Sequence, residues 1–211
     1  MLNAVVDLSH YNHPVDFVEA AAGGILGVVH KATEGLENID PMYAERRPLA
    51  QSVGLLWGAY HLGHSLNGVA QAHHYLSIIG DTNGVLLMLD LEIPSGDPGM
   101  GRLQAEAFVE AVYAATSRYP GIYSTPDYLA EIGAGQSTVL RNCWLWIADY
   151  RLVAEPVVPS PWKIWTMWQY TDGKDGNEPR TAAGIGPCDR DQFNGEPTGL
   201  HALWGVPMLP A

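Results

Sequence analysis

The sequence has few basic residues and no long apolar run. Its 211 residues include 11 Lys or Arg against 23 Asp or Glu, which gives a formal net charge of −12. Phosphate backbones and anionic lipids repel such a surface, so we expect neither nucleic acid nor a membrane as a partner. Apolar runs such as 84–89 end in Asp or Gly well short of the roughly 20 residues of a membrane-spanning helix.

Cysteine is also scarce, with only Cys143 and Cys188. Two cysteines in a chain of this length do not make a disulfide framework, and we expect both thiols to be free and buried. The first Lys or Arg is Lys31, so no basic segment precedes an apolar one as in a secretory signal peptide. We therefore expect a protein that stays where it is made.

What the chain does contain is enough apolar material for one large core. Hydrophobic residues make up 47% of the sequence and charged residues 16%, which excludes a disordered chain. No repeat, low-complexity tract or Pro/Ser-rich linker divides the chain. We expect a single domain over residues 1–211.

Short runs of β-branched and aromatic residues alternate with helical patterns in the first part of the chain. The runs predict eight strands, at 4–7, 25–31, 55–61, 85–92, 121–124, 144–149, 163–170 and 187–193. The helical patterns fall at 15–22, 42–53, 69–79, 100–118 and 126–132, and the later connections read as loops. This α/β alternation favours a parallel sheet closed into a compact (β/α)-barrel. A doubly wound open sheet is the alternative, but no Gly-x-Gly-x-x-Gly follows the first strand.

The sharpest chemical signal is Asp90-Leu91-Glu92, at the end of a predicted buried strand. Residues i and i+2 of a strand face the same way, roughly 6.6 Å apart along the backbone. Two carboxyls on one inward face repel each other, which raises the pKa of at least one and keeps a proton available for general acid catalysis. The pattern is typical of glycosidases, and a solvated pair at a strand end is the alternative.

Other acids belong to the first and last predicted strands. Asp7 ends the first strand, where it could instead cap the following turn. Asp189 and Asp191 belong to the last strand, where they could pair with Arg190 or hold a cation. Polar or aromatic side chains occupy the remaining strand ends: Lys31, Glu34, Tyr60, His61, Tyr123, Asp149, Gln169 and Tyr170.

Histidine and aromatic residues suggest further roles. The eight histidines raise the alternative of a zinc site, but none of their spacings matches a common zinc motif, so we expect no metal and no other cofactor. His61 stays a candidate site residue because it ends a strand. Flat aromatic faces near strand ends are candidates for stacking on sugar rings: Tyr60, Tyr123, Trp146, Trp168 and Tyr170.

Seven short motifs occur in the order found in the glycoside hydrolase family 25 lysozymes, which the chain resembles from about residue 5 to residue 193. They are VVDLS at 5–9, HKATEG at 30–35, GAYH at 58–61, LDLE at 89–92, LWIA at 145–148, WQY at 168–170 and CDRDQF at 188–193. The resemblance implies an irregular, TIM-like (β/α)-barrel with about eight strands and fewer helices. It also implies N-acetylmuramidase activity, the hydrolysis of the β-1,4 bond between N-acetylmuramic acid and N-acetylglucosamine in bacterial peptidoglycan.

The resemblance also implies roles for the acids. Glu92 matches the general acid, Asp90 the partner that orients or stabilises the reacting sugar, and Asp7 and Asp189 the other acidic positions. Substrate-binding roles are expected for Lys31, Glu34, Tyr60, His61, Tyr123, Trp146, Trp168, Gln169, Tyr170 and Asp191. Two positions depart from the pattern: His30, where an aliphatic residue is common, and Asp191, where Asn is common.

We expect a retaining muramidase that works as a monomer without a separate wall-binding module. A phage endolysin fits this description, held in the host cytoplasm until a holin releases it to the wall. Two other classes stay open. A non-catalytic glycan-binding barrel would keep the aromatic residues and lose an acid, although all four acids are present. The other is a barrel hydrolase acting on another acidic or amide substrate, with or without a metal.

Overall fold

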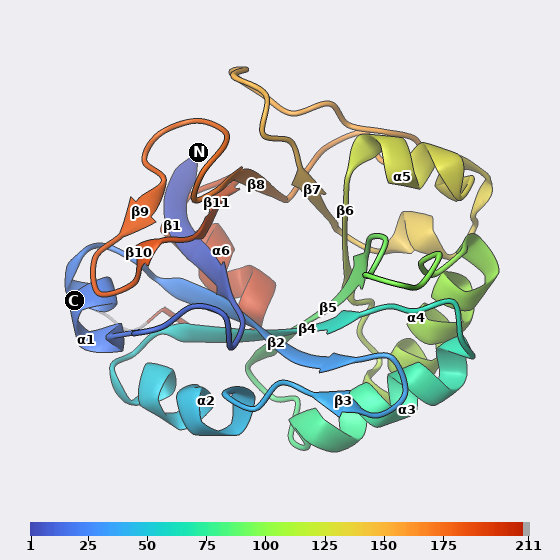
Figure 1. Ribbon diagram of the computed structural model, residues 1–211, viewed down its shortest axis with the longest axis horizontal. Helices are drawn as coiled ribbons and strands as arrows, with labels where there is room; N and C mark the ends of the chain where they lie inside the picture. The colour runs from blue at the N-terminus through green and yellow to red at the C-terminus, as the bar shows by residue number, and fades with distance from the viewer. Residues whose placement is uncertain (209–211) are drawn as a thin grey trace.

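A computed structural model describes residues 1–208 of the chain. Eight strands close into a barrel, in the order β1, β11, β8, β7, β6, β5, β4 and β2, and β2 pairs back to β1 (Figure 1). The barrel strands are β1 (Leu2–Leu8), β2 (Gly27–Glu34), β4 (Leu56–Leu62), β5 (Val85–Leu91), β6 (Gly121–Ser124), β7 (Leu145–Ala148), β8 (Met167–Asp172) and β11 (Asp189–Phe193). The predicted eight-stranded α/β barrel is therefore confirmed.

One strand runs against the others, which corrects the expectation of a fully parallel barrel. The neighbours from β1 round to β8 are parallel, but β11 is antiparallel to both β1 and β8. The chain between β8 and β11 forms the small hairpin of β9 (Thr181–Ala182) and β10 (Gly186–Pro187), not a crossover helix. A strand that returns without a crossover must enter the sheet in the opposite direction. Its first residue, Asp189, therefore lies beside Asp7 near the end of β1.

Five helices follow the predicted segments closely. They are α1 (Phe17–Ala22), α2 (Tyr43–Ser52), α3 (Gly68–Ile79), α4 (Arg102–Thr116) and α5 (Pro126–Glu131). Side chains cap the N-termini of three of these helices. Asp16 caps α1 by accepting from the amides of Val18 and Glu19, and Asn67 and Thr125 cap α3 and α5. The helices are fewer than the strands because the chain after β6 connects mostly through loops and short turns, as the resemblance implied.

The sequence prediction missed six short elements and misplaced several strand boundaries, most clearly the start of β8. The missed elements are β3 (Asn38–Ile39), β9, β10, α6 (Pro197–Trp204) and the 3-10 helices η1 (Ala134–Gln136) and η2 (Leu140–Asn142). The strand expected at 163–170 begins only at Met167, because the preceding residues form turns around Trp162. An aromatic-rich loop and a buried strand have the same composition, so periodicity did not separate them.

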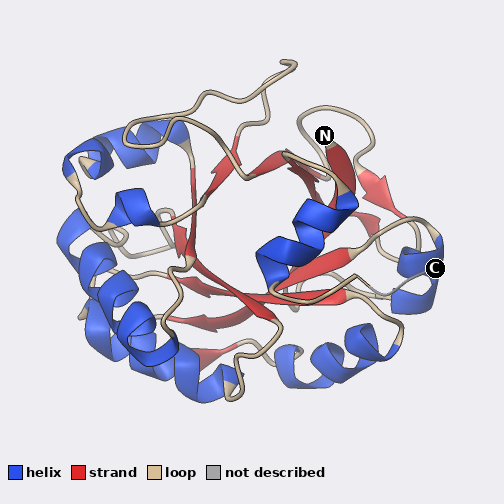
Figure 2. Cartoon of the chain, turned by 180° about the vertical axis from the view of Figure 1, so that it is seen from behind, coloured by secondary structure: helices blue, strands red, loops and turns tan. Residues whose placement is uncertain are grey.

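Helix α6 closes the end of the barrel opposite the carboxyl ends of the parallel strands, and Figure 2 shows it from behind. Leu200 and Trp204 are fully buried and pack with Val5, Leu56 and Leu86 of the barrel interior. The barrel is thus filled from this end and open only at the other.

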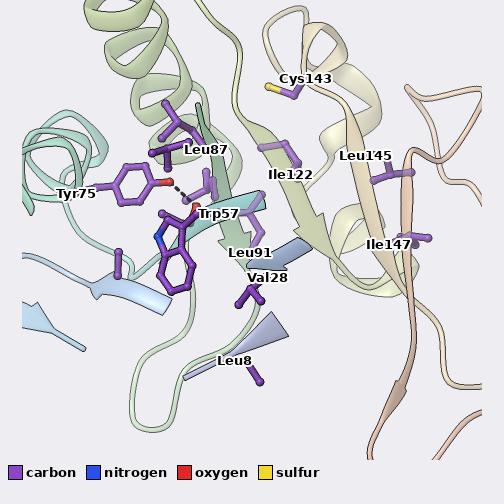
Figure 3. Packing of buried hydrophobic residues seen from close by; sticks show 14 of the residues in the cluster. Leu8, Val28, Trp57, Tyr75, Leu87, Leu91, Ile122, Cys143, Leu145 and Ile147 are labelled. Carbon is purple, nitrogen blue, oxygen red and sulfur yellow. Dashed lines mark hydrogen bonds between the residues drawn. The ribbon is translucent and has the colours of Figure 1, made fainter. Parts of the chain in front are cut away.

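A larger core lies between the outer face of the sheet and the helices (Figure 3). Trp57, Leu87, Leu91 and Ile122 belong to it, and Tyr75 of α3 donates to the Ala59 carbonyl at 2.6 Å. Both cysteines are free and buried, which confirms the expectation for the thiols. None of the helices within residues 1–208 is long and apolar enough to cross a membrane.

The α6 end of the barrel generates a stability prediction. Trp204→Ala should lower the free energy of unfolding by about 3–5 kcal/mol, because it leaves a cavity among buried side chains. Leu103→Ala on α4, where Leu103 is 69% exposed, is the control and should cost less than about 0.5 kcal/mol. Urea unfolding of both variants measures the difference. If both variants lost the same free energy of unfolding, α6 would not stabilise the barrel.

Candidate active site

A cleft of about 200 Å³ opens at the carboxyl ends of the parallel strands. Four acids form most of its polar wall, and uncharged side chains from four neighbouring segments complete it. The lining residues are Asp7, Tyr60, Asp90, Glu92, Tyr123, Trp146, Tyr150, Gln169 and Asp189. The acids that the sequence placed at separate strand ends therefore meet in one cavity.

Asp90 and Glu92 occupy different depths of this cleft. Asp90 lies on β5 and is 6% exposed, and its Oδ1 is a buried oxygen without a hydrogen-bond partner among the described residues. Glu92 lies one residue beyond the strand and is exposed at the mouth. The intervening Leu91 points the other way into the outer core. One carboxyl is therefore held inside the barrel with an oxygen free for a ligand, while the other can exchange protons with water.

Withdrawal from water raises the pKa of both carboxyls, and a neighbouring carboxylate adds to it in each case: Glu92 acts on Asp90, and Glu34 acts on Glu92. Burial raises the pKa of Asp90 well above its usual range, and the neighbouring Glu92 charge adds to the effect. Burial also raises the pKa of Glu92, while the Lys31 ammonium lowers the pKa of both groups. A carboxyl with a raised pKa keeps its proton closer to neutrality, as a general acid must.

A chain of hydrogen bonds orients Asp7. The Gln169 Oε1 atom accepts from the hydroxyls of Tyr123, at 2.7 Å, and Tyr150. This fixes the amide so that Nε2 donates to Asp7 Oδ2 at 2.7 Å. Burial, and then the charges of Asp189 and Asp191, still raise the pKa of Asp7 well above its usual range.

The antiparallel β11 adds Asp189 and Asp191. Burial and the nearby Asp172 raise the pKa of Asp189 to about 7. Asp191 is fully buried below the cleft, where its Oδ1 accepts from the Trp146 indole at 2.6 Å. Burial raises the pKa of Asp191 to about 8, even though that indole favours its charged form. Its carboxyl also pairs with that of Asp7, and this contact requires a proton on one of the two groups.

Lys31 and Glu34 lie together beside the cleft because of an irregularity in β2. The register of β2 against β4 shifts between Lys31 and Thr33, so the usual alternation of faces is interrupted there. Lys31 Nζ then reaches Glu34 Oε2 at 2.5 Å, and Glu34 Oε1 lies 2.9 Å from His64 Nε2. Although burial opposes it, hydrogen bonds from Lys31 and His64 lower the pKa of Glu34. Glu34 thereby holds the ammonium whose charge acts on Asp90.

Asp191 was expected to bind substrate but is buried outside the cleft lining, and three more expected site residues lie away from the cleft. His61 is fully buried with Nδ1 2.8 Å from the Thr33 hydroxyl and Nε2 3.1 Å from Gln71 Oε1. Burial lowers the pKa of His61 to about 3. Trp168 and Tyr170 also belong to the outer core, because neighbours of the inward-facing Gln169 must face outward. None of the three can touch a substrate in the cleft.

Tyr150 is a cleft residue that the sequence analysis missed. It follows Asp149, which was noted at the strand end but turns to Arg151, with 2.6 Å between Oδ2 and Nη2. The alternation of faces along Trp146, Ala148 and Tyr150 was the available signal, since Trp146 and Ala148 both face the barrel interior. Within residues 1–208, no three His, Cys, Asp or Glu side chains are grouped to hold a metal ion.

The site combines a buried carboxyl, an accessible carboxyl with a raised pKa and aromatic walls at the open end of an α/β barrel. This arrangement defines a glycoside hydrolase. The sequence matches the glycosyl hydrolases family 25 over residues 6–178, and the chain belongs to that family. Asp189 and Asp191 lie beyond the matched segment and join the site through the pairing of β11 with β1.

Relatives and solved structures agree with this assignment. An N,O-diacetylmuramidase of Chalaropsis sp is 29% identical over 79% of this chain and 86% of its own. Lysozyme M1 of Streptomyces globisporus is 28% identical over 94% of this chain and 70% of its own. The bacterial lysozyme from Streptomyces coelicolor superposes with a TM-score of 0.84 at 28% identity, covering 96% of both chains. A family GH25 lysozyme from Aspergillus fumigatus superposes with a TM-score of 0.80 at 31% identity, covering 96% of this chain and 98% of its own.

The buried Asp191 generates a prediction about stability and pH. Its pKa is raised in the folded protein, so the folded state binds an extra proton between about pH 4 and pH 8, and stability falls as pH rises through that window. Asp191→Asn can still accept from Trp146 but cannot ionise. The variant should therefore match the parent near pH 4 and exceed it by at least about 1 kcal/mol at pH 8.

Urea unfolding at several pH values tests this prediction. Asp175→Asn, at an exposed position, is the matched control and should leave the pH dependence unchanged. The free energy of unfolding of the Asp191→Asn variant should still fall somewhat as pH rises, because the pKa values of Asp7 and Asp189 are also raised. Identical slopes for the Asp191→Asn variant and the parent would contradict the assignment of a buried proton to Asp191.

Proposed function

We propose that this protein is a retaining muramidase that cleaves the β-1,4 bond between N-acetylmuramic acid and N-acetylglucosamine in bacterial peptidoglycan. One observation carries the proposal: a buried Asp90 oxygen without a partner lies two residues from the accessible Glu92, in a cleft at the open end of the barrel. The names of the relatives, a diacetylmuramidase and a lysozyme, support the same substrate class.

Glu92 acts as the general acid in the first step. Its proton passes to the glycosidic oxygen as the bond from that oxygen to the anomeric carbon breaks, so the leaving sugar departs as a neutral alcohol. Glu92 suits this role better than Asp90 because it is exposed at the cleft mouth, where water can restore its protonation state between turnovers. The walls of the cleft partly desolvate its carboxyl, which raises the pKa of Glu92 and keeps the proton available.

Asp90 acts on the anomeric carbon as positive charge develops there. Burial raises the pKa of Asp90 and opposes its charged form, whereas the Lys31 ammonium and the positive charge that develops on the sugar favour that form. Its free Oδ1 is available to the sugar. Either this carboxylate or the acetamido oxygen of the substrate, oriented by Asp90, forms the covalent intermediate. In the second step Glu92 takes a proton from water, which attacks the same carbon, and both routes return the original anomeric configuration.

Asp7 and Asp189 complete the acidic wall and assist binding of the sugar. Asp7 is held by Gln169, so its orientation does not depend on the ligand. Tyr60, Tyr123 and Trp146 supply the apolar surfaces of the cleft. The endolysin role, release by a holin and the monomeric state stay predictions.

The products of peptidoglycan digestion test this proposal. Mass spectrometry after borohydride reduction should find muropeptides with N-acetylmuramic acid at the new reducing end, because the cleft acts on the glycan bond. The digestion should also proceed in EDTA, since carboxyls supply the acid and the anionic charge. Free peptide stems without new reducing ends, or a loss in EDTA that zinc reverses, would favour the metal-dependent amide hydrolase.

The role of Glu92 generates a mutational prediction. Glu92→Gln keeps the size and polarity of the side chain but has no transferable proton. General acid catalysis contributes typically about 10²- to 10⁴-fold, so turnover should fall by at least about 100-fold while the fold and glycan binding persist. Glu110→Gln, exposed on α4, is the matched control. A folded Glu92→Gln enzyme with more than about a tenth of the parent turnover would move the proton donor to another acid.

A further inference from the structure

A second hollow lies on a different part of the molecule from the catalytic cleft and shares no lining residue with it. Its volume is about 540 Å³, and it forms where β7 and β8 begin. The wall includes Trp144 and Leu145 at the start of β7, residues 160–164 of the loop before β8, and Arg141 of the preceding turn. Figure 3 shows Cys143 and Leu145, two of its buried lining residues, at this side of the sheet.

The charge of this groove is opposite to that of the protein as a whole. The chain carries a net charge of −12, and four acids line the catalytic cleft without any base. The groove is lined by Arg141 and Lys163 and by no acid. Both side chains are exposed, and within residues 1–208 neither forms an ion pair. Arg141 uses only Nε, which donates to the Ser137 carbonyl at 3.2 Å, so the rest of its guanidinium is available to a ligand.

Two tryptophans stand in the same groove in fixed positions. The Trp144 indole lies over Gly121, where a Cβ atom would come within 2.3 Å of the ring, so the absence of a side chain there admits the ring. Trp162 donates from Nε1 to the Cys143 carbonyl at 2.8 Å. Both rings are only partly buried. Held aromatic faces next to unpaired cations match a ligand made of sugar rings that carry negative groups.

We propose that this groove is a second, non-catalytic binding site for an anionic glycan strand. Sugar rings stack on Trp144 or Trp162, and carboxylate or phosphate groups of the strand bind Arg141 and Lys163. The inference rests on the proposed function for the source of the ligand, because bacterial walls offer peptidoglycan carboxylates and phosphodiester polymers. A strand held here keeps the enzyme on an insoluble wall while the cleft releases its products.

Binding to insoluble wall material tests the groove directly. The Glu92→Gln protein, its cleft saturated with a short soluble glycan fragment, is sedimented with purified walls. Adding Arg141→Glu and Lys163→Glu should weaken binding at least about tenfold, because two attractive contacts with the anionic strand become repulsive. Both positions are exposed, so the fold should tolerate the change. Trp144→Ala should also weaken binding, with circular dichroism as the check of folding.

The single variants Lys163→Glu and Lys174→Glu form a matched pair. Both replace an exposed lysine and change the net charge equally, but only Lys163 lines the groove. Only Lys163→Glu should reduce binding. With Glu92 restored, it should also slow turnover of insoluble walls while kcat/KM on the short soluble fragment stays within about twofold.

The wall preparation distinguishes the two sources of negative charge. If binding survives removal of phosphodiester polymers and still depends on Lys163, the groove binds peptidoglycan carboxylates. If that removal abolishes the dependence on Lys163, the groove binds phosphate groups, and the proposal holds in either case. Equal binding of Lys163→Glu and Lys174→Glu proteins to every preparation would overturn it. Failure of the parent to cleave the soluble fragment would instead count against the muramidase assignment.

Discussion

Crowding of carboxyl groups at the open end of the barrel is the constraint on which the site depends. Asp7, Asp90, Asp189 and Asp191 are largely withdrawn from water, and the pKa of each is raised. Charged carboxylates so close together repel, and burial removes the water that would screen them. The folded protein therefore holds protons that an unfolded chain would release, and the closed barrel stabilises this arrangement through packing elsewhere.

The response to this crowding differs from one acid to the next. Asp7 receives a donor from Gln169, and Asp191 receives one from Trp146. Asp90 has one unpartnered oxygen and the electrostatic influence of Lys31. A missing partner makes a carboxyl that lines the cleft ready for a ligand, whereas Asp191, one of whose oxygens also lacks a partner among the described residues, does not line the cleft. These differences separate structural from reacting carboxyls within a single cavity.

The barrel supports the site from its opposite end. Helix α6 fills the interior with Leu200 and Trp204, so the space above them is short and its polar groups lie near the mouth. The antiparallel β11 then brings Asp189 alongside Asp7, which no parallel strand of the same sequence would do. The strand pairing that closes the barrel therefore also brings the acids together.

Much of this organisation could be predicted from the sequence because its causes are local. Strand β6 was predicted at its observed bounds, and Asp90 and Glu92 share a face because a strand has a period of two residues. The same rule implied that Gln169 faces opposite to Trp168, but it could not say which of them faces inward. That choice depends on the direction in which the sheet curves.

The sequence by itself determined the α/β alternation, the paired acids and the family, since composition, period and motif order are properties of the chain alone. Tertiary structure decided the direction of β11, the burial of His61 between β4 and α3, and the meeting of Arg141 with Lys163 in a groove away from the cleft. Each of these depends on contacts between segments far apart in sequence. Such contacts form only when the barrel closes, and no local propensity encodes them.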